Sequence, residues 1–125
     1  MTHELLLDAR GIVKSFGGNA VLRGVDFDVR VGEVHALLGE NGAGKSTLTK
    51  IIGGVHRADA GTVVYDGAPT EFRDPGSAVR EGISTVYQEL NLIPHLDCAA
   101  NIFLGREPET ALFAHGRQMR TEAAA

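Results

Sequence analysis

Nine consecutive residues of the chain have the types and the spacing of a loop that binds phosphate. They read Gly39-Glu40-Asn41-Gly42-Ala43-Gly44-Lys45-Ser46-Thr47 and fit the pattern G-x-x-x-x-G-K-[ST]. The three glycines predict a backbone of positive φ that approaches a ligand with no Cβ in the way. The amide N–H groups of such a loop turn inward and surround an anion. Lys45 is expected to reach the β- and γ-phosphates of a nucleotide, and the Ser46 hydroxyl to ligate Mg²⁺.

The segments on either side of this loop are those that a nucleotide site requires. Residues 33–38 are a short apolar run that predicts a buried strand. Leu48, Ile51 and Ile52 recur at helical spacing, and a Gly-Gly pair at 53–54 predicts the end of that helix. A helix that begins near Lys45 adds about half an electron of positive charge at its N-terminus. Strand, loop and helix together favour nucleotide binding over an incidental glycine-rich turn.

The composition limits the alternatives. The chain has 125 residues, which is one domain at most, and 43% of them are hydrophobic. It carries 12 basic and 16 acidic residues, a net charge of −4, with no basic run, which argues against nucleic acid as a partner. The single cysteine excludes an internal disulfide, and the five histidines have no metal-ligand spacing. No apolar stretch approaches the length of a membrane span.

Local patterns predict further elements around the loop. Alternating apolar residues or β-rich composition predict strands at 5–13, 25–29, 62–65 and 83–87. Turns are expected at 16–19 and 66–67. Short helices are expected at 75–82, with Asp74 as N-cap, and from Asp97 to Leu104. After residue 105 the composition is polar and weakly patterned.

Three stretches carry a family resemblance: "GEVHALLGENGAGKSTL" at 32–48, "GISTVYQELNLIPHLD" at 82–97 and "NIFLGRE" at 101–107. With the turn at 14–18 they cover most of residues 5–107. The chain resembles the ATP-binding subunit of ABC transporters, and within it the N-terminal part of the first nucleotide-binding domain of the monosaccharide-importer type. The resemblance implies an α/β fold, an incomplete P-loop NTPase core with an N-terminal antiparallel β subdomain. Residues 1–104 would be the partial nucleotide-binding domain and 105–125 the truncated start of a helical subdomain.

The resemblance also assigns roles outside the phosphate loop. Phe16 matches the aromatic residue that stacks on adenine; the alternative is a core phenylalanine at a strand end. Gln88 matches the glutamine that contacts Mg²⁺ and the attacking water; the alternative is a solvated polar residue after a strand. Residues 89–97 match the segment next to the permease docking surface. The implied ligands are ATP and Mg²⁺, with Ser46 and Gln88 on the metal.

Three catalytic elements of the family are missing from the sequence. They are an apolar strand ending in Asp-Glu, a Leu-Ser-Gly-Gly-Gln signature and a later switch histidine. Two apolar runs end in aspartate, at Asp8 and Asp66, but neither is followed by glutamate. We therefore assign no catalytic residue and expect Mg-ATP binding without appreciable hydrolysis. The simplest explanation is that this is the front portion of a longer ATPase, with marginal stability on its own.

The resemblance implies a subunit that couples ATP binding and hydrolysis to carbohydrate import from the inner face of the cell membrane. Its implied partners are transmembrane permease subunits, a second ATPase cassette paired head to tail and, indirectly, a periplasmic or extracellular sugar-binding protein. Two alternatives stay open: a non-catalytic nucleotide-binding module that completes a partner's site, and an inert truncated remnant. A GTPase is disfavoured because no Asn-Lys-x-Asp motif occurs. The sequence does not identify the sugar.

Overall fold

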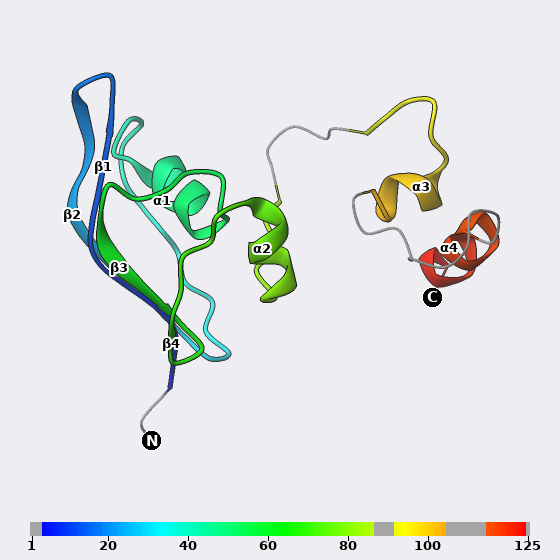
Figure 1. Cartoon of the computed structure of the whole chain (residues 1–125), viewed down its shortest axis with the longest axis horizontal. Helices are drawn as coiled ribbons and strands as arrows, with labels where there is room; N and C mark the ends of the chain where they lie inside the picture. Colours follow the sequence, from blue (N-terminus) through cyan, green and yellow to red (C-terminus); the bar gives the residue numbers. More distant parts are fainter. Residues whose placement is uncertain (1–3, 87–91, 105–114, 125) are drawn as a thin grey trace. The chain divides into compact units, whose positions relative to one another are not determined.

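The computed structural model describes residues 4–86, 92–104 and 115–124, with the side chains of 115–118 excepted. It separates into two compact units, residues 1–86 and residues 87–125 (Figure 1). Each unit is described by itself. The functional division at residue 104, made from the family resemblance, stays a prediction.

A four-stranded antiparallel sheet is the frame of the first unit. Its order is β2-β1-β3-β4, with the two longest strands, β1 (Leu5–Phe16) and β2 (Asn19–Arg30), paired as a hairpin. The hairpin turns through Gly17 and Gly18, whose φ values of 55° and 84° suit the tight turn that matches strand twist. β3 (Ala60–Tyr65) pairs with the other edge of β1. The three predicted strands and the turn are confirmed here, but the bounds differ: β1 ends three residues later than expected, β2 begins six residues earlier and β3 two residues earlier.

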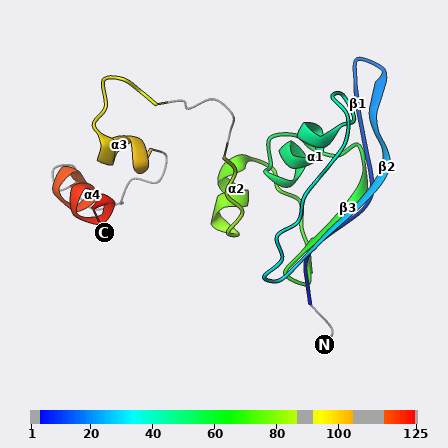
Figure 2. The same ribbon diagram turned by 180° about the vertical axis from the view of Figure 1, so that it is seen from behind.

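The core lies between one face of this sheet and α1 (Lys45–Ile52). Ala9, Ile12 and Leu22 from the hairpin are buried against Leu48 and Ile51 of the helix. The view from behind shows the same packing of α1 alongside the strands (Figure 2). Burial of these apolar side chains stabilises the fold and fixes where α1 begins relative to β2.

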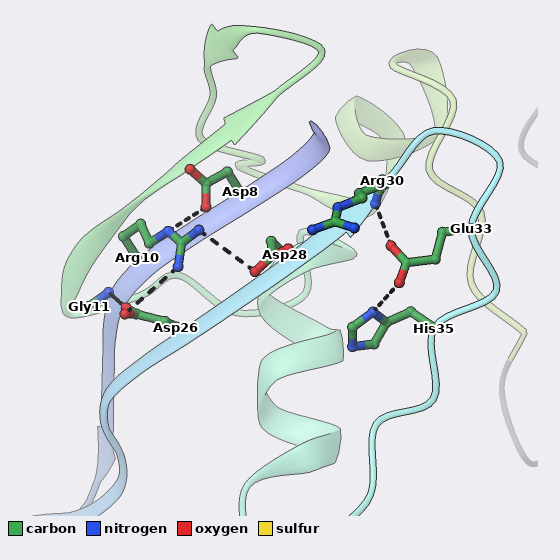
Figure 3. A network of polar contacts seen from close by, with 8 residues as sticks. All are labelled: Asp8, Arg10, Gly11, Asp26, Asp28, Arg30, Glu33 and His35. Carbon is green, nitrogen blue, oxygen red and sulfur yellow. Dashed lines mark hydrogen bonds and ion pairs between the residues drawn. The ribbon is translucent and has the colours of Figure 1, made fainter. Parts of the chain in front are cut away.

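The opposite face of the hairpin is charged. Arg10 lies among three carboxylates, those of Asp8, Asp26 and Asp28 (Figure 3). Asp8 and Asp28 are directly paired across the strands, and like charges in that position repel. The Asp26 carboxylate also accepts a hydrogen bond from the Gly11 amide at 2.7 Å. The Arg10 guanidinium therefore offsets a repulsion that is built into the register of β1 and β2.

The predicted buried strand at residues 33–38 does not form in the described structure. Val34 is fully exposed and Leu38 is 88% exposed, although Leu37 packs against the core. Within the described ranges, no backbone hydrogen bond joins residues 34–38 to another segment. An apolar pattern signals burial, but a strand also needs a neighbour that completes its ladder. The same correction applies at 83–86, where Val86 is 94% exposed; Tyr87 lies outside the described residues.

Local capping explains the next elements of the first unit. Asp66 and Gly67 both have positive φ and turn β3 into the short strand β4 (Ala68–Pro69). α2 (Pro75–Arg80) begins at a capping box in which the Asp74 carboxylate accepts a hydrogen bond from the Ser77 amide at 2.8 Å. The predicted hairpin signal and the predicted cap are both confirmed.

The second unit contains two described helices, α3 (Cys98–Ile102) and α4 (His115–Ala123). Asp97 caps α3, as predicted, by accepting a hydrogen bond from the Ala100 amide at 2.8 Å. The same carboxylate pairs with Arg120 of α4 at 3.1 Å. No helix in the described ranges is long and apolar enough to cross a membrane.

Candidate functional site

The phosphate loop of the first unit ends at a left-handed glycine. Gly44 is the N-cap of α1, with a φ of 91°, and Gly42 has a φ of 87°. Both fulfil the expectation of positive φ. Gly39 does not, and for it the expectation was wrong. Its position requires space instead, because a Cβ there would lie 3.3 Å from the Cβ of Ala43 and 3.6 Å from Cδ of Lys45.

Gly44 also fixes the loop against the sheet. A Cβ on Gly44 would lie 2.6 Å from Cδ2 of Leu22 and 3.2 Å from the carbonyl oxygen of Val21. Only glycine combines this close approach with the left-handed backbone. The start of α1 is therefore held directly on β2. In both overall views the turn that precedes α1 lies at the same end of the unit as the β1–β2 turn (Figures 1 and 2).

The loop presents backbone donors that the described protein does not use. The Ala43 amide donates to the Glu40 carbonyl at 3.1 Å, and the Leu48 amide donates to the Gly44 carbonyl at 2.9 Å. Within the part of the chain that the structure describes, the other amides of residues 39–47 have no acceptor, among them those of Gly42, Gly44, Lys45 and Ser46. Free amides at a helix N-terminus are a binding arrangement for anions such as phosphate.

The Lys45 side chain folds back over the same loop. Its ammonium donates to the carbonyl oxygens of Gly39 at 2.6 Å and Glu40 at 2.7 Å. A cation is thereby placed beside the free amides, so the donor set fits a polyphosphate. Contact with the β- and γ-phosphates would require the ammonium to exchange these carbonyls for phosphate oxygens, and this stays a prediction.

Ser46 and its neighbours fit the metal part of the expectation. Ser46 is exposed at the start of α1, and its hydroxyl has no hydrogen-bond partner among the described residues. Of the other loop residues, Glu40 and Asn41 are exposed and Thr47 is half-buried. A serine hydroxyl next to the phosphate lysine is the oxygen ligand that Mg²⁺ takes in such loops. The described residues hold no cluster of three or more His, Cys, Asp or Glu that would bind a metal by themselves.

Phe16 lies at the last position of β1, and its side chain is 41% exposed. The ring is therefore not enclosed in the core. His56 contacts it edge-on, with ring centroids 5.2 Å apart and an interplanar angle of 65°. The ammonium of Lys14 lies 5.4 Å from the centre of the same ring. Stacking of a nucleotide base on this ring stays a prediction.

One acidic side chain joins the end of β1, next to Phe16, to the segment after α1. The Asp59 carboxylate accepts hydrogen bonds from the Lys14 ammonium and from the Ser15 amide, both at 2.7 Å. These bonds, that of Lys14 first, hold the pKa of Asp59 below its ordinary value. Nothing in its spacing indicates contact with β1, because the partners lie far apart along the chain.

Gln88 and residues 89–91 lie outside the described residues, so the predicted contact of Gln88 with Mg²⁺ stays a prediction. The following turn is described and well organised. The Asn101 side chain accepts a hydrogen bond from the Ile93 amide at 2.8 Å. Its amide group donates to three backbone carbonyls, those of Ile93, Leu96 and Asp97.

A family model described as "ABC transporter" matches residues 22–125. The chain belongs to the ABC transporter family. This confirms the resemblance drawn from the phosphate loop and the two later stretches. Together with the sheet described above, it makes the fold a partial P-loop NTPase core with an antiparallel N-terminal β subdomain.

Curated relatives carry the names of sugar import proteins. The ribose import ATP-binding protein RbsA of Geobacillus kaustophilus is 58% identical over 104 residues, which are 83% of this chain and 21% of the relative. A putative ribose/galactose/methyl galactoside import ATP-binding protein of Burkholderia ambifaria is 51% identical over 122 residues, 98% of this chain and 24% of the relative. The ABC chain thus spans about a fifth to a quarter of the length of these relatives.

Solved structures agree on the fold of this ABC chain. A nucleotide-free ATP-binding cassette from an ABC transporter is similar with a TM-score of 0.65 and 35% identity, over 68% of this chain and 34% of that one. The ADP conformation of the ATP-binding cassette MJ1267 is similar with a TM-score of 0.60 and 36% identity, over 62% of this chain and 31% of that one.

Proposed function

We propose that the chain binds Mg-ATP as the front part of the ATPase that drives a monosaccharide importer. The observation that carries the proposal is the cluster of free amides between Gly42 and Ser46 with the Lys45 ammonium beside it. The named relatives support the transport class, since each of them is a sugar import ATP-binding protein. The kind of sugar is left open.

Each part of the site would take one part of the nucleotide. The loop amides and Lys45 would hold the phosphates, and the Ser46 hydroxyl would ligate Mg²⁺. The exposed Phe16 ring would stack on the adenine. The metal supplies neutralisation of phosphate charge when it is bound. Gln88 would contact the metal and the attacking water, and relay the nucleotide state to a permease.

The chain by itself would bind ATP without turning it over. Its sequence has no strand that ends in Asp-Glu and no signature segment, and loss of groups that stabilise transition-state charge costs about 10³–10⁵ in rate in related hydrolases. The corresponding test combines Mg-ATP titration with an assay of phosphate release from the purified chain. Saturable binding without steady release is expected. Steady release that Lys45→Ala abolishes would contradict the proposal.

The partners follow from the family. We propose permease subunits, contacted through the segment after Gln88, a second cassette paired head to tail, and an indirect connection to a sugar-binding protein. The chain would work at the inner face of the cell membrane.

One alternative is a nucleotide-binding module that completes a partner's site, because the chain offers a phosphate loop without a signature. Titration with a complete homologous subunit separates the two, since ATPase activity restored beyond that of the added subunit favours the module. Absence of all nucleotide binding would favour an inert remnant.

A further inference from the structure

The end of β1 and the segment after α1 are fastened together by three kinds of contact. The Asp59 amide donates to the Val13 carbonyl at 2.8 Å, and its carboxylate binds Lys14 and the Ser15 amide at 2.7 Å. Beside these bonds, the rings of His56 and Phe16 meet edge to face. The contacts lie at consecutive positions on β1, so this strand end is held along its length.

The segment that makes these contacts is itself fixed to the helix of the phosphate loop. The Val55 and His56 amides both donate to the Lys50 carbonyl, at 2.8 and 3.1 Å. Lys50 belongs to the last turn of α1, and Gly44 at the other end of α1 is held on β2. A short, hydrogen-bonded connection therefore runs from the phosphate loop through α1 to His56.

Two described side chains lie against the Phe16 ring, those of Lys14 and His56, and they differ chemically. Lys14 is a cation near the ring centre, and its charge is already paired with Asp59. His56 is an aromatic neighbour, and an edge-to-face pair prefers one mutual orientation. At 41% exposure the Phe16 side chain is not enclosed on all sides by the core, so its neighbours influence its orientation. Of the two, His56 is the residue that restricts the ring.

We propose that His56 is a positioning residue for base recognition: it orients the Phe16 ring and fixes it relative to the phosphate loop through α1. This rests on the proposed function and deepens it. The phosphates would be held by the loop whether or not His56 is present. Only the contribution of the base to affinity would depend on it.

The test compares two ligands on the same proteins. Mg-ATP and magnesium tripolyphosphate are titrated by calorimetry into the 125-residue chain and into His56→Ala, His56→Phe and Phe16→Ala. Arg57→Ala is the matched control, since Arg57 is the exposed neighbour of His56 and its ion pair among the described residues is with Glu71, at 3.7 Å. Tripolyphosphate binding reports whether the phosphate loop of each variant is intact.

His56→Ala is expected to weaken Mg-ATP binding about three- to tenfold, the range of one aromatic pair, and to leave tripolyphosphate affinity within about twofold. His56→Phe should restore ATP affinity because it keeps an aromatic edge. An unchanged ATP affinity in His56→Ala, or an equal loss for both ligands, would overturn the proposal. So would a Phe16→Ala variant that loses no preference for ATP over tripolyphosphate.

The same data separate the two levels of the account. Wild-type binding of both ligands, with no loss of ATP affinity in His56→Ala, would overturn the positioning role alone. No binding of either ligand by the wild-type chain would overturn the proposed function and the positioning role with it.

Discussion

The α-carbon of Gly44 faces Leu22 so closely that a Cβ added to it would lie 2.6 Å from the Leu22 Cδ2 atom. This approach joins the start of α1 to β2 and sets the position of the free amides. It also means that the glycines of the loop differ in how well they would tolerate a side chain. Gly42 has a similar φ, but a Cβ added to it would have no neighbouring atom within 4 Å.

Gly44→Ala is therefore expected to be more damaging than Gly42→Ala. Both variants carry a left-handed alanine, at a cost of about 1–2 kcal/mol. Gly44→Ala adds a steric conflict of about 1–3 kcal/mol with the core. Hydrogen exchange of the α1 and β2 amides measures the difference. Equal loss of protection in the two variants would show that the contact with Leu22 does not determine the loop position.

The hydrogen bonds of Glu33 should make the local stability around Arg30 depend on pH. Its carboxylate accepts a hydrogen bond from the Arg30 amide at 2.8 Å and faces His35 Nδ1 at 3.1 Å (Figure 3). The Arg30 bond first, and then His35, hold the pKa of Glu33 below its ordinary value. A depressed folded-state pKa means that the stabilisation is present above the ordinary pKa, near 4.3, and is lost as pH falls through the lower folded value.

The amide chemical shift of Arg30 should consequently titrate with a midpoint below about 4.3. In Glu33→Gln this transition should vanish, because the amide side chain does not ionise. A midpoint at or above the ordinary value would mean that the two hydrogen bonds do not form in solution.

Asn101 predicts order in the turn at 93–97. Among the described residues, its side chain makes four hydrogen bonds to backbone groups of this turn. Removing them in Asn101→Ala should cost about 1–3 kcal/mol of local stability, because carbonyls and an amide in a partly buried turn lose their partners. Asn101→Asp should cost more, since a carboxylate would face three carbonyl oxygens. Protection of the Ile93 amide against exchange measures both, and an Asn101→Asp variant as protected as wild type would refute this role.

Val34 predicts self-association of the purified chain. Val34 is fully exposed and Leu38 nearly so, on a segment whose backbone makes no described hydrogen bonds to other segments. Exposed apolar residues beside unpaired backbone favour association. Val34→Lys should lower the associated fraction in sedimentation without changing ATP affinity. A wild-type chain that stays monomeric at high concentration would show that residues 34–38 do not mediate self-association.

Local signals predicted most of the turns and helix caps of the described residues. The glycine turn at 17–18, the Asp66-Gly67 hairpin and the caps at Asp74 and Asp97 all depend on neighbours within a few residues, and all are confirmed. The strands predicted at 33–38 and 83–87 do not form over the described residues. A strand needs a hydrogen-bonding neighbour, and that neighbour comes from elsewhere in the chain. Hydrophobicity alone cannot supply that partner.

The candidate site shows the same division. The loop, the helix after it and the family were predictable because they follow from consecutive residues. The contacts of Phe16 with His56, and of Lys14 with Asp59, were not, because folding brings these residues together from distant positions. Gly39 shows a finer limit, since its place in the glycine pattern suggested positive φ where the structure requires only space.

Calorimetric titration of Mg-ATP into wild type and Lys45→Ala tests the central claim most directly. Lys50→Ala is the control, since Lys50 is an exposed lysine of the same helix. A hydrogen bond from a charged donor contributes about 1.5–3 kcal/mol. Lys45→Ala is therefore expected to bind Mg-ATP about 10- to 100-fold more weakly, and Lys50→Ala to bind it as wild type does. Magnesium-dependent binding that is equally strong in all three proteins, or absent from folded wild type, would contradict the assignment of residues 39–47 as the nucleotide site.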